Sequence, residues 1–213
     1  MKRTDGDAAI RDYAAIGDGR TTALVARDGS IDWLCLPDVD SPPVFGRLLD
    51  PERGGSFLLE PTGPFDVERT YRPGSNVLET SFRTASGTVR VTDALTLADR
   101  TIDSPMRELV RQIEPIEGEV PMRWSVEPAF GPNRRSRVER RGDRVVISAG
   151  RDALAVGAWG AGEVEVHERG VAGELTAKDE PAVLALASAH GEPLVFVGKE
   201  QAQQSLERTD RVR

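Results

Sequence analysis

The sequence predicts an all-β protein built as an antiparallel β-sandwich. Three observations support this fold class. Segments between residues 55 and 197 alternate apolar and polar side chains, which is typical of strands with one buried face. Turn signals separate these segments at intervals of roughly 8 to 12 residues. The 21 Gly and 14 Pro residues are spread along the chain without a period, as expected for many turns between short elements.

The first predicted element is a β-hairpin over residues 21–36. Two β-prone runs are joined by Asp28-Gly29, a pair that suits a tight turn. Asp32 and Trp33 are neighbours on the second run, so we expect their side chains on opposite faces of one strand. Cys35 lies between two leucines in the same apolar run, where a free cysteine usually behaves as a small hydrophobic residue.

Alternation predicts the later strands. The clearest example covers residues 120–126, in which valine, methionine and tryptophan alternate with more polar neighbours and a proline. A second hairpin is expected around Ala85-Ser86-Gly87, which joins two β-prone runs. The strands predicted in this way cover residues 78–82, 88–92, 154–158 and 164–166.

Helical signals are confined to two places. A short helical turn is expected at residues 44–49, after two prolines, and a helix is expected from residue 199 onward. The apolar anchors of this last segment are nearly limited to Leu206 and Val212, and such a polar helix needs a partner surface. We therefore expect a β-sandwich domain over residues 1–198 and the start of a linker helix over residues 199–213.

Composition argues against several classes of protein. The 28 Lys and Arg against 35 Asp and Glu give a net charge of −7, which disfavours nucleic-acid binding. The longest apolar run, at residues 182–187, is far shorter than the roughly 20 residues of a membrane span. No secretory pattern follows the first residues, so a cytoplasmic location is expected. One Cys and two His leave no disulfide and no clustered zinc site, and we expect neither metal nor cofactor.

Two charged segments need separate interpretation. Six arginines lie within residues 134–144, but Glu139 and Asp143 interrupt them and no aromatic residue lies among them. This pattern favours a solvated hairpin, or contact with an acidic neighbour, over nucleic-acid binding.

The second charged segment, residues 18–40, holds five aspartates. Paired carboxylates can hydrolyse a glycosidic bond, whereas aspartate beside glycine is usually turn chemistry, as expected for Asp28. The structural explanation is less secure for Asp18, Arg20, Asp32 and Asp40, because many charges in a short apolar segment must be paired to be buried.

The segment over residues 12–50 resembles the opening of bacterial glycoside hydrolase family 15 enzymes, the glucoamylase and trehalase group. The resemblance rests on Asp28-Gly-Ser-Ile-Asp-Trp-Leu-Cys-Leu-Pro37, followed by Asp40-Ser41-Pro42 and Phe45, and continues more diffusely along the chain. It implies a trehalase-like N-terminal domain, a supersandwich-like β-sandwich that precedes a helical (α/α)6 catalytic barrel. Residue 213 lies about where a connecting helix is expected to lead into that barrel. Family members commonly carry Arg-Phe where this chain has Asp38-Val39.

The resemblance implies a parent enzyme that hydrolyses α-glucosidic bonds with inversion, using two glutamates of the barrel. It therefore implies no catalytic residue in this chain, which would stabilise the barrel and shape its entrance. The implied partners are the chain's own barrel and, at its entrance, α-glucan or trehalose, with no nucleic acid and no membrane. Residues expected at the substrate entrance or the domain interface are Asp18, Arg20, Asp32, Trp33, Asp40, Ser41, Pro42 and Phe45.

Two alternatives stay open at this point. An independent carbohydrate-binding module would stack aromatic rings on sugar faces, yet Trp33, Trp124 and Trp159 lie in strand-like patterns where core packing is the stronger expectation. A separately encoded subunit that docks to a barrel in trans would expose an apolar patch of more than about a few hundred Å².

Overall fold

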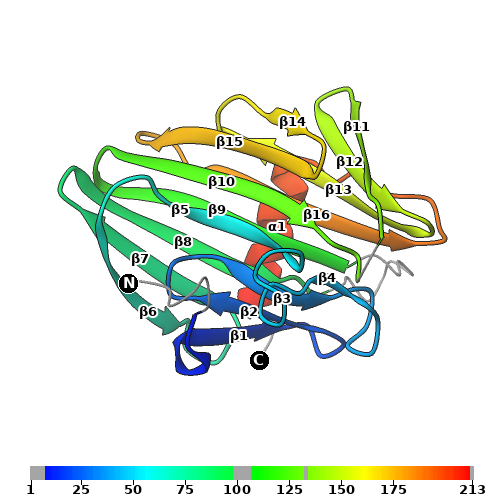
Figure 1. Ribbon diagram of the computed structural model, residues 1–213. Helices are drawn as coiled ribbons and strands as arrows, with labels where there is room; N and C mark the ends of the chain where they lie inside the picture. The colour runs from blue at the N-terminus through cyan, green and yellow to red at the C-terminus, as the bar shows by residue number, and fades with distance from the viewer. Residues whose placement is uncertain (1–7, 98–106, 132–133, 212–213) are drawn as a thin grey trace.

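Two large antiparallel sheets pack face to face, which confirms the predicted all-β sandwich (Figure 1). The computed structural model describes residues 8–97, 107–131 and 134–211. A short 3-10 helix, η1 (Ile10–Asp12), precedes the first strand, and one α-helix, α1 (Lys199–Arg211), follows the last. The helix runs across the outer face of the second sheet (Figure 1).

The first sheet has the strand order β1-β2-β3-β5-β10-β15-β14, with β4 paired to β3. All neighbouring strands within this sheet are antiparallel. Its strands are β1 (Tyr13–Gly17), β2 (Thr22–Ala26), β3 (Ile31–Cys35), β4 (Pro43–Phe45), β5 (Gly55–Pro61), β10 (Val120–Pro128), β14 (Glu165–His167) and β15 (Gly170–Ala177).

The second sheet has the order β11-β12-β13-β16-β9-β8-β7-β6 and is also antiparallel. Strand β9 is its longest and lies near the middle. The strands are β6 (Phe65–Tyr71), β7 (Leu78–Thr84), β8 (Gly87–Leu95), β9 (Arg107–Gly118), β11 (Arg137–Arg141), β12 (Arg144–Ala149), β13 (Asp152–Trp159) and β16 (Ala182–His190).

The predicted hairpin is confirmed as β2 and β3, with Leu24 opposite Trp33. Its turn depends on Gly29, which has a φ of 88° and packs tightly against β5. A Cβ atom at this position would lie 2.1 Å from the carbonyl oxygen of Leu59, so a side chain there requires the backbone to move. The turn therefore fixes the hairpin against the neighbouring strand.

The expected helical turn at residues 44–49 is displaced. Val44 and Phe45 belong to β4, and the turn begins at Gly46, whose carbonyl accepts hydrogen bonds from the amides of Leu49 (2.9 Å) and Asp50 (3.1 Å). Phe45 pairs with Leu34 of β3 and is fully buried. Burial of this aromatic ring in the core keeps the first two residues extended against the local helical preference.

A buried ion pair lies in the core between the sheets. Arg111 of β9 and Asp93 of β8 are both fully buried, and the Arg111 Nε donates to Asp93 Oδ1 at 2.8 Å. The same guanidinium reaches the first sheet, where Nη1 donates to the carbonyl oxygen of Phe57 (3.1 Å) and Nη2 to that of Gly29 (2.7 Å). It also lies 4.8 Å from the centre of the Phe57 ring. One side chain therefore joins both sheets and the hairpin turn.

A second apolar cluster covers the other face of the second sheet. Val110, Val183 and Ala185 contribute from the strands, and Ala202 and Leu206 contribute from α1. The helix therefore buries part of the outer face of this sheet, which explains how a polar C-terminal segment is held.

We expect Asp93→Asn to lower the free energy of unfolding by about 3 to 5 kcal/mol, because the Arg111 charge then lies buried without a counter-charge. Urea denaturation followed by circular dichroism measures the change. Asp66 is exposed on the edge strand β6, so Asp66→Asn is the matched control and should shift stability by less than about 0.5 kcal/mol. Equal effects of the two substitutions would contradict the role given to the buried pair.

Candidate functional site

Four charged residues from distant parts of the chain meet at one end of the sandwich. We call Asp18, Arg20, Asp38 and Arg107 the end cluster. The Arg107 side chain is almost fully buried, with Nε 3.6 Å from Asp18 Oδ2 and Nη2 3.8 Å from Asp38 Oδ1. Its Nε also donates to the carbonyl oxygen of Pro37 at 3.2 Å. Arg20 Nε lies 3.3 Å from Asp38 Oδ1.

The end cluster holds two loops together. Asp18 Oδ1 accepts hydrogen bonds from the amides of Arg20 and Thr21, both at 2.9 Å, and this closes the turn between β1 and β2. Arg107, the first residue of β9, connects this turn to the loop between β3 and β4. Both carboxylates are thus engaged by arginine, an arrangement that fixes loop geometry.

Asp32 lies in a separate buried network. Its Oδ2 accepts a hydrogen bond from the Tyr13 hydroxyl at 2.7 Å, and its Oδ1 accepts one from the Ser30 hydroxyl at 2.5 Å. Arg47 Nε lies 4.0 Å from Oδ1, and the Leu48 amide donates to the Asp32 carbonyl oxygen at 3.1 Å. Asp32 therefore connects β1, β3 and the turn after β4.

The structure brings together only part of the predicted residue set. Asp18 and Arg20 belong to the end cluster, and Asp40, Ser41 and Pro42 follow Asp38 on the same loop. The amide of Ser41 donates to the Asp38 carbonyl oxygen at 3.0 Å, and the Asp38 amide donates to the Ser41 hydroxyl at 3.3 Å, so this loop is internally bonded.

The other predicted residues lie elsewhere. Asp32 is in its own network, Trp33 is partly buried on the opposite face of β3, and Phe45 is fully buried with its ring centre 6.4 Å from that of Phe57. The sequence interpretation missed Arg107, because its acceptor at Pro37 lies 70 positions away and no local pattern connects the two. The entrance or interface role of the eight residues stays a prediction.

The C-terminal end of α1 lies at the same end of the sandwich. Thr209 and Leu97 border a pocket of about 280 Å³ together with the β1–β2 turn, which includes Asp18. The Leu97 amide donates to the Thr209 hydroxyl at 3.0 Å, and Arg72 Nη1 donates to Asp210 at 3.2 Å. The last turn of the helix is therefore anchored next to the turn that the end cluster stabilises (Figure 1).

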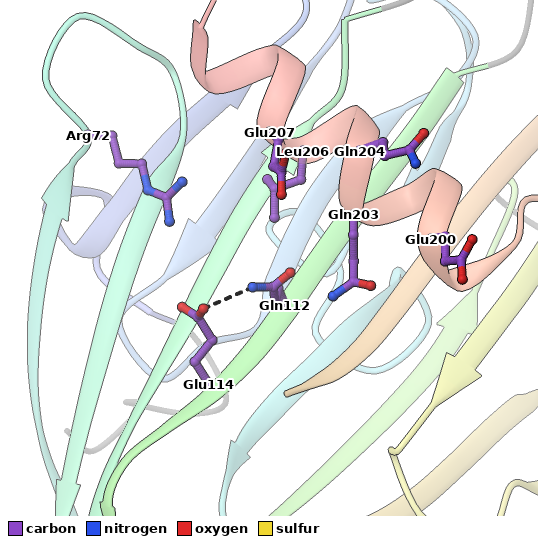
Figure 2. Close-up of a pocket in the computed structure, with 8 residues that line it drawn as sticks. All are labelled: Arg72, Gln112, Glu114, Glu200, Gln203, Gln204, Leu206 and Glu207. Atoms are coloured by element: carbon purple, nitrogen blue, oxygen red, sulfur yellow. Dashed lines mark hydrogen bonds between the residues drawn. The ribbon is translucent and has the colours of Figure 1, made fainter. Parts of the chain in front are cut away.

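A polar pocket of about 420 Å³ lies between α1 and the second sheet, and Figure 2 shows its lining. Gln112 donates to Glu114 across the pocket floor at 3.0 Å. Burial alone would lower the pKa of Arg72, but Glu79 and Asp210 raise it, so this guanidinium is held by the domain's own carboxylates. The pocket is lined by Arg72, Gln112, Glu114, Glu200, Gln203, Gln204, Leu206 and Glu207, without an aromatic ring.

A larger groove of about 870 Å³ lies beside β4. Pro43, Gly46 and Pro128 form part of its wall. Arg134 at its rim is already engaged, since Nη1 lies 2.5 Å from Asp152 Oδ2. Pro43, the residue that follows the Asp40-Ser41-Pro42 segment, therefore lines a groove that combines apolar walls with a charged rim.

The aromatic and thiol groups that the sequence singled out are mostly structural. Trp124 is buried, and its Nε1 donates to the Ala161 carbonyl oxygen at 2.8 Å. The Arg144 guanidinium lies 4.6 Å from the centre of the Trp159 ring. Burial, and to a lesser degree Asp40, raise the pKa of the Cys35 thiol, which favours the neutral thiol over the nucleophilic thiolate.

The arginine-rich segment forms the hairpin of β11 and β12. Arg137 and Arg141 both pair with Glu139, at 2.6 and 3.1 Å, and Arg140 donates to the Val164 carbonyl oxygen. These arginines are thus engaged by neighbouring groups of the domain itself. Within residues 8–97, 107–131 and 134–211, no three His, Cys, Asp or Glu side chains form a metal-binding group. No helix in that part of the chain is both long and apolar enough to cross a bilayer.

Comparison with known proteins gives a consistent set of relatives. A family model described as "Trehalase-like, N-terminal" matches residues 4–209. The chain is 39% identical over 141 residues to a trehalase of Mycolicibacterium smegmatis, which covers 59% of this chain and 21% of that protein. It is 37% identical over 143 residues to a trehalase of Mycobacterium tuberculosis, covering 59% and 20%.

A more distant relative is trehalase 1 of Sulfolobus acidocaldarius, 35% identical over 116 residues, which covers 54% of this chain and 18% of that protein. The matched part therefore spans about a fifth of the length of these curated relatives.

We expect Tyr13→Phe to lower the free energy of unfolding by about 1.5 to 3 kcal/mol, because the lost hydrogen bond ends on a buried carboxylate. Tyr71→Phe is the matched control. Its hydroxyl donates to the carbonyl oxygen of Ala15 at an exposed position, so a smaller loss of about 0.5 to 1.5 kcal/mol is expected. Chemical denaturation of both variants measures these changes. A larger loss of unfolding free energy in Tyr71→Phe than in Tyr13→Phe would show that the Asp32 network is not a stabilising centre.

Proposed function

This chain belongs to the family of trehalase-like N-terminal domains, and on that premise we propose that it is the non-catalytic accessory domain of a glycoside hydrolase of family 15. In this proposal the two catalytic glutamates lie in an (α/α)6 barrel outside the chain and hydrolyse an α-glucosidic bond with inversion. The domain packs on that barrel, stabilises it and shapes its entrance. The relatives named above are trehalases about five times longer than the matched region, which supports both the accessory role and trehalose as the substrate.

The observation that carries the proposal is the meeting of the end cluster with the end of α1. The last turn of α1 lies beside the β1–β2 turn, so any segment that follows the helix starts at this end of the sandwich. The loop between β3 and β4 projects here with Val39 64% exposed and with Asp40 and Pro42 also exposed. An apolar tip held on a rigid, ion-paired base suits a protein interface.

Three of the five carboxylates in residues 18–40 support a structural assignment. Asp18 and Asp38 pair with arginine, and Asp32 is fully buried with two hydroxyl donors. A glycosidase needs one carboxyl group to donate a proton and a second to activate water or attack the sugar, both facing the bond. Carboxylates that are committed to arginine and hydroxyl partners within the fold do not meet this requirement.

The purified chain is expected to release no glucose from trehalose or from maltose, because the reacting carboxylates belong to the absent barrel. A coupled glucose assay at high enzyme concentration measures this. Turnover that is abolished by Asp→Asn at Asp18, Asp32 or Asp40 would overturn the accessory assignment.

A chimera tests the interface. Residues 4–209 replace the matching region of the M. smegmatis trehalase, and the product is expected to hydrolyse trehalose. Val39→Asp should then reduce trehalose hydrolysis by about fivefold or more, because a buried unpaired carboxylate costs at least about 1 kcal/mol. Initial rates of glucose release and thermal unfolding measure the effect.

The matched control for Val39→Asp is Ile116→Asp. Ile116 is 50% exposed near the opposite end of β9, so its substitution should leave the chimera unchanged. The isolated chain should tolerate both changes equally. A Val39→Asp chimera with full activity and stability would exclude this loop from the interface.

A further inference from the structure

Helix α1 is held on the second sheet by few contacts. Only four of its 13 residues are buried, namely Ala202, Ser205, Leu206 and Thr209, and two of these are polar. Short polar helices depend on tertiary packing for their stability. Any change beneath this narrow buried face therefore has a large influence on whether the helix stays docked.

A buried carboxyl group lies beneath that face. Glu108 of β9 is 6% exposed, and its Oε2 accepts a hydrogen bond from the Thr96 hydroxyl at 2.8 Å. Its Oε1 is buried and forms no hydrogen bond of normal geometry, and the Ser205 hydroxyl of α1 is a weaker polar partner that acts to lower the pKa of Glu108. A buried carboxylate oxygen without a partner is costly, whereas a protonated oxygen at that place has a hydrogen to donate.

The surroundings of Glu108 supply little compensating charge. Opposite it on β16 is Ala187, and on the β8 side is Thr96, both neutral. From α1 come Ser205, which is neutral, and Arg208, the one charged group with a resolved influence on Glu108. Burial raises the pKa of Glu108, and the opposing effects of Thr96, Ser205 and Arg208 do not cancel it.

We propose that Glu108 makes the docking of α1 depend on protonation: the neutral carboxyl holds the helix on the sheet, and the ionised carboxylate loosens it. The direction of this pH dependence follows from the coupling between proton binding and helix docking. With its pKa raised above the ordinary 4.5, Glu108 binds its proton more tightly when α1 is docked. The stabilisation is therefore complete below pH 4.5 and is lost as the pH rises through the raised value.

The other anchors of α1 differ in their response to pH. The hydrogen bond from Leu97 to Thr209 contains no titratable group. The ion pair between Arg72 and Asp210, with Glu79 on the same guanidinium, contains two carboxylates. Glu114, Glu200 and Glu207 also line the pocket beside α1, so the Glu108 variants, and not acidification alone, identify the controlling group. Because any segment after α1 is attached to this helix, the angle at which it leaves the sandwich would respond to pH.

Amide hydrogen exchange of the α1 residues, corrected for the intrinsic effect of pH, tests the proposal on the whole chain. Protection in the unmodified protein should fall with rising pH by up to about tenfold per unit within the sensitive range. In Glu108→Gln, and in the uncharged, apolar Glu108→Met, protection should stay at the acid level throughout. Glu114→Gln, on the same face of β9, should behave as the unmodified protein.

Two results would overturn the proposal. One is a flat pH profile of α1 protection in the unmodified protein, and the other is an unchanged profile in both Glu108 variants. Thr209→Val should lower protection equally at every pH, which separates a general weakening of the helix from a protonation effect. The measurement uses no catalytic activity, so its result is independent of the accessory role proposed above.

Discussion

The buried guanidinium of Arg111 is the contact on which the rest of the architecture depends. It satisfies the carboxylate of Asp93 within its own sheet and two carbonyl oxygens of the opposite sheet, at Gly29 and Phe57. An ion pair in a core is weak evidence for high stability, because desolvation of both charges offsets their attraction. Its contribution here is geometric, since four defined hydrogen bonds, two to Asp93 and one each to Gly29 and Phe57, restrict how the sheets are placed relative to each other.

Strand β9 extends this constraint to the two regions with a proposed role. Its residues alternate between faces, so Arg111 and Leu109 enter the core while Glu108 and Val110 lie under α1. At its first residue, Arg107 connects the two loops of the end cluster. Strand β9 thus contributes residues to the core, to the surface under α1 and to the end cluster.

Two groups of charged side chains in this domain help to hold its own structure. The arginines of the β11–β12 hairpin engage Glu139 and backbone carbonyl groups, and the aspartates near the N-terminus engage arginine and hydroxyl donors. Charged groups that are fixed in this way are suited to presenting a rigid surface. Family membership and these engaged charges are the grounds for the accessory role proposed above.

Local sequence patterns determined much of the secondary structure. The hairpin around Asp28-Gly29, the alternating strands and the C-terminal helix were all predictable, because the spacing of apolar residues along the chain directly encodes which face is buried. Only the tertiary structure decided the partners of the charged residues. Arg111 bonds to Gly29 across 82 positions and Arg107 to Pro37 across 70, and Glu108 lies under a helix that begins at Lys199. The extended conformation of Phe45 has the same origin, since its ring packs against a different strand. Such contacts depend on strand order and sheet packing, which no window of neighbouring residues contains.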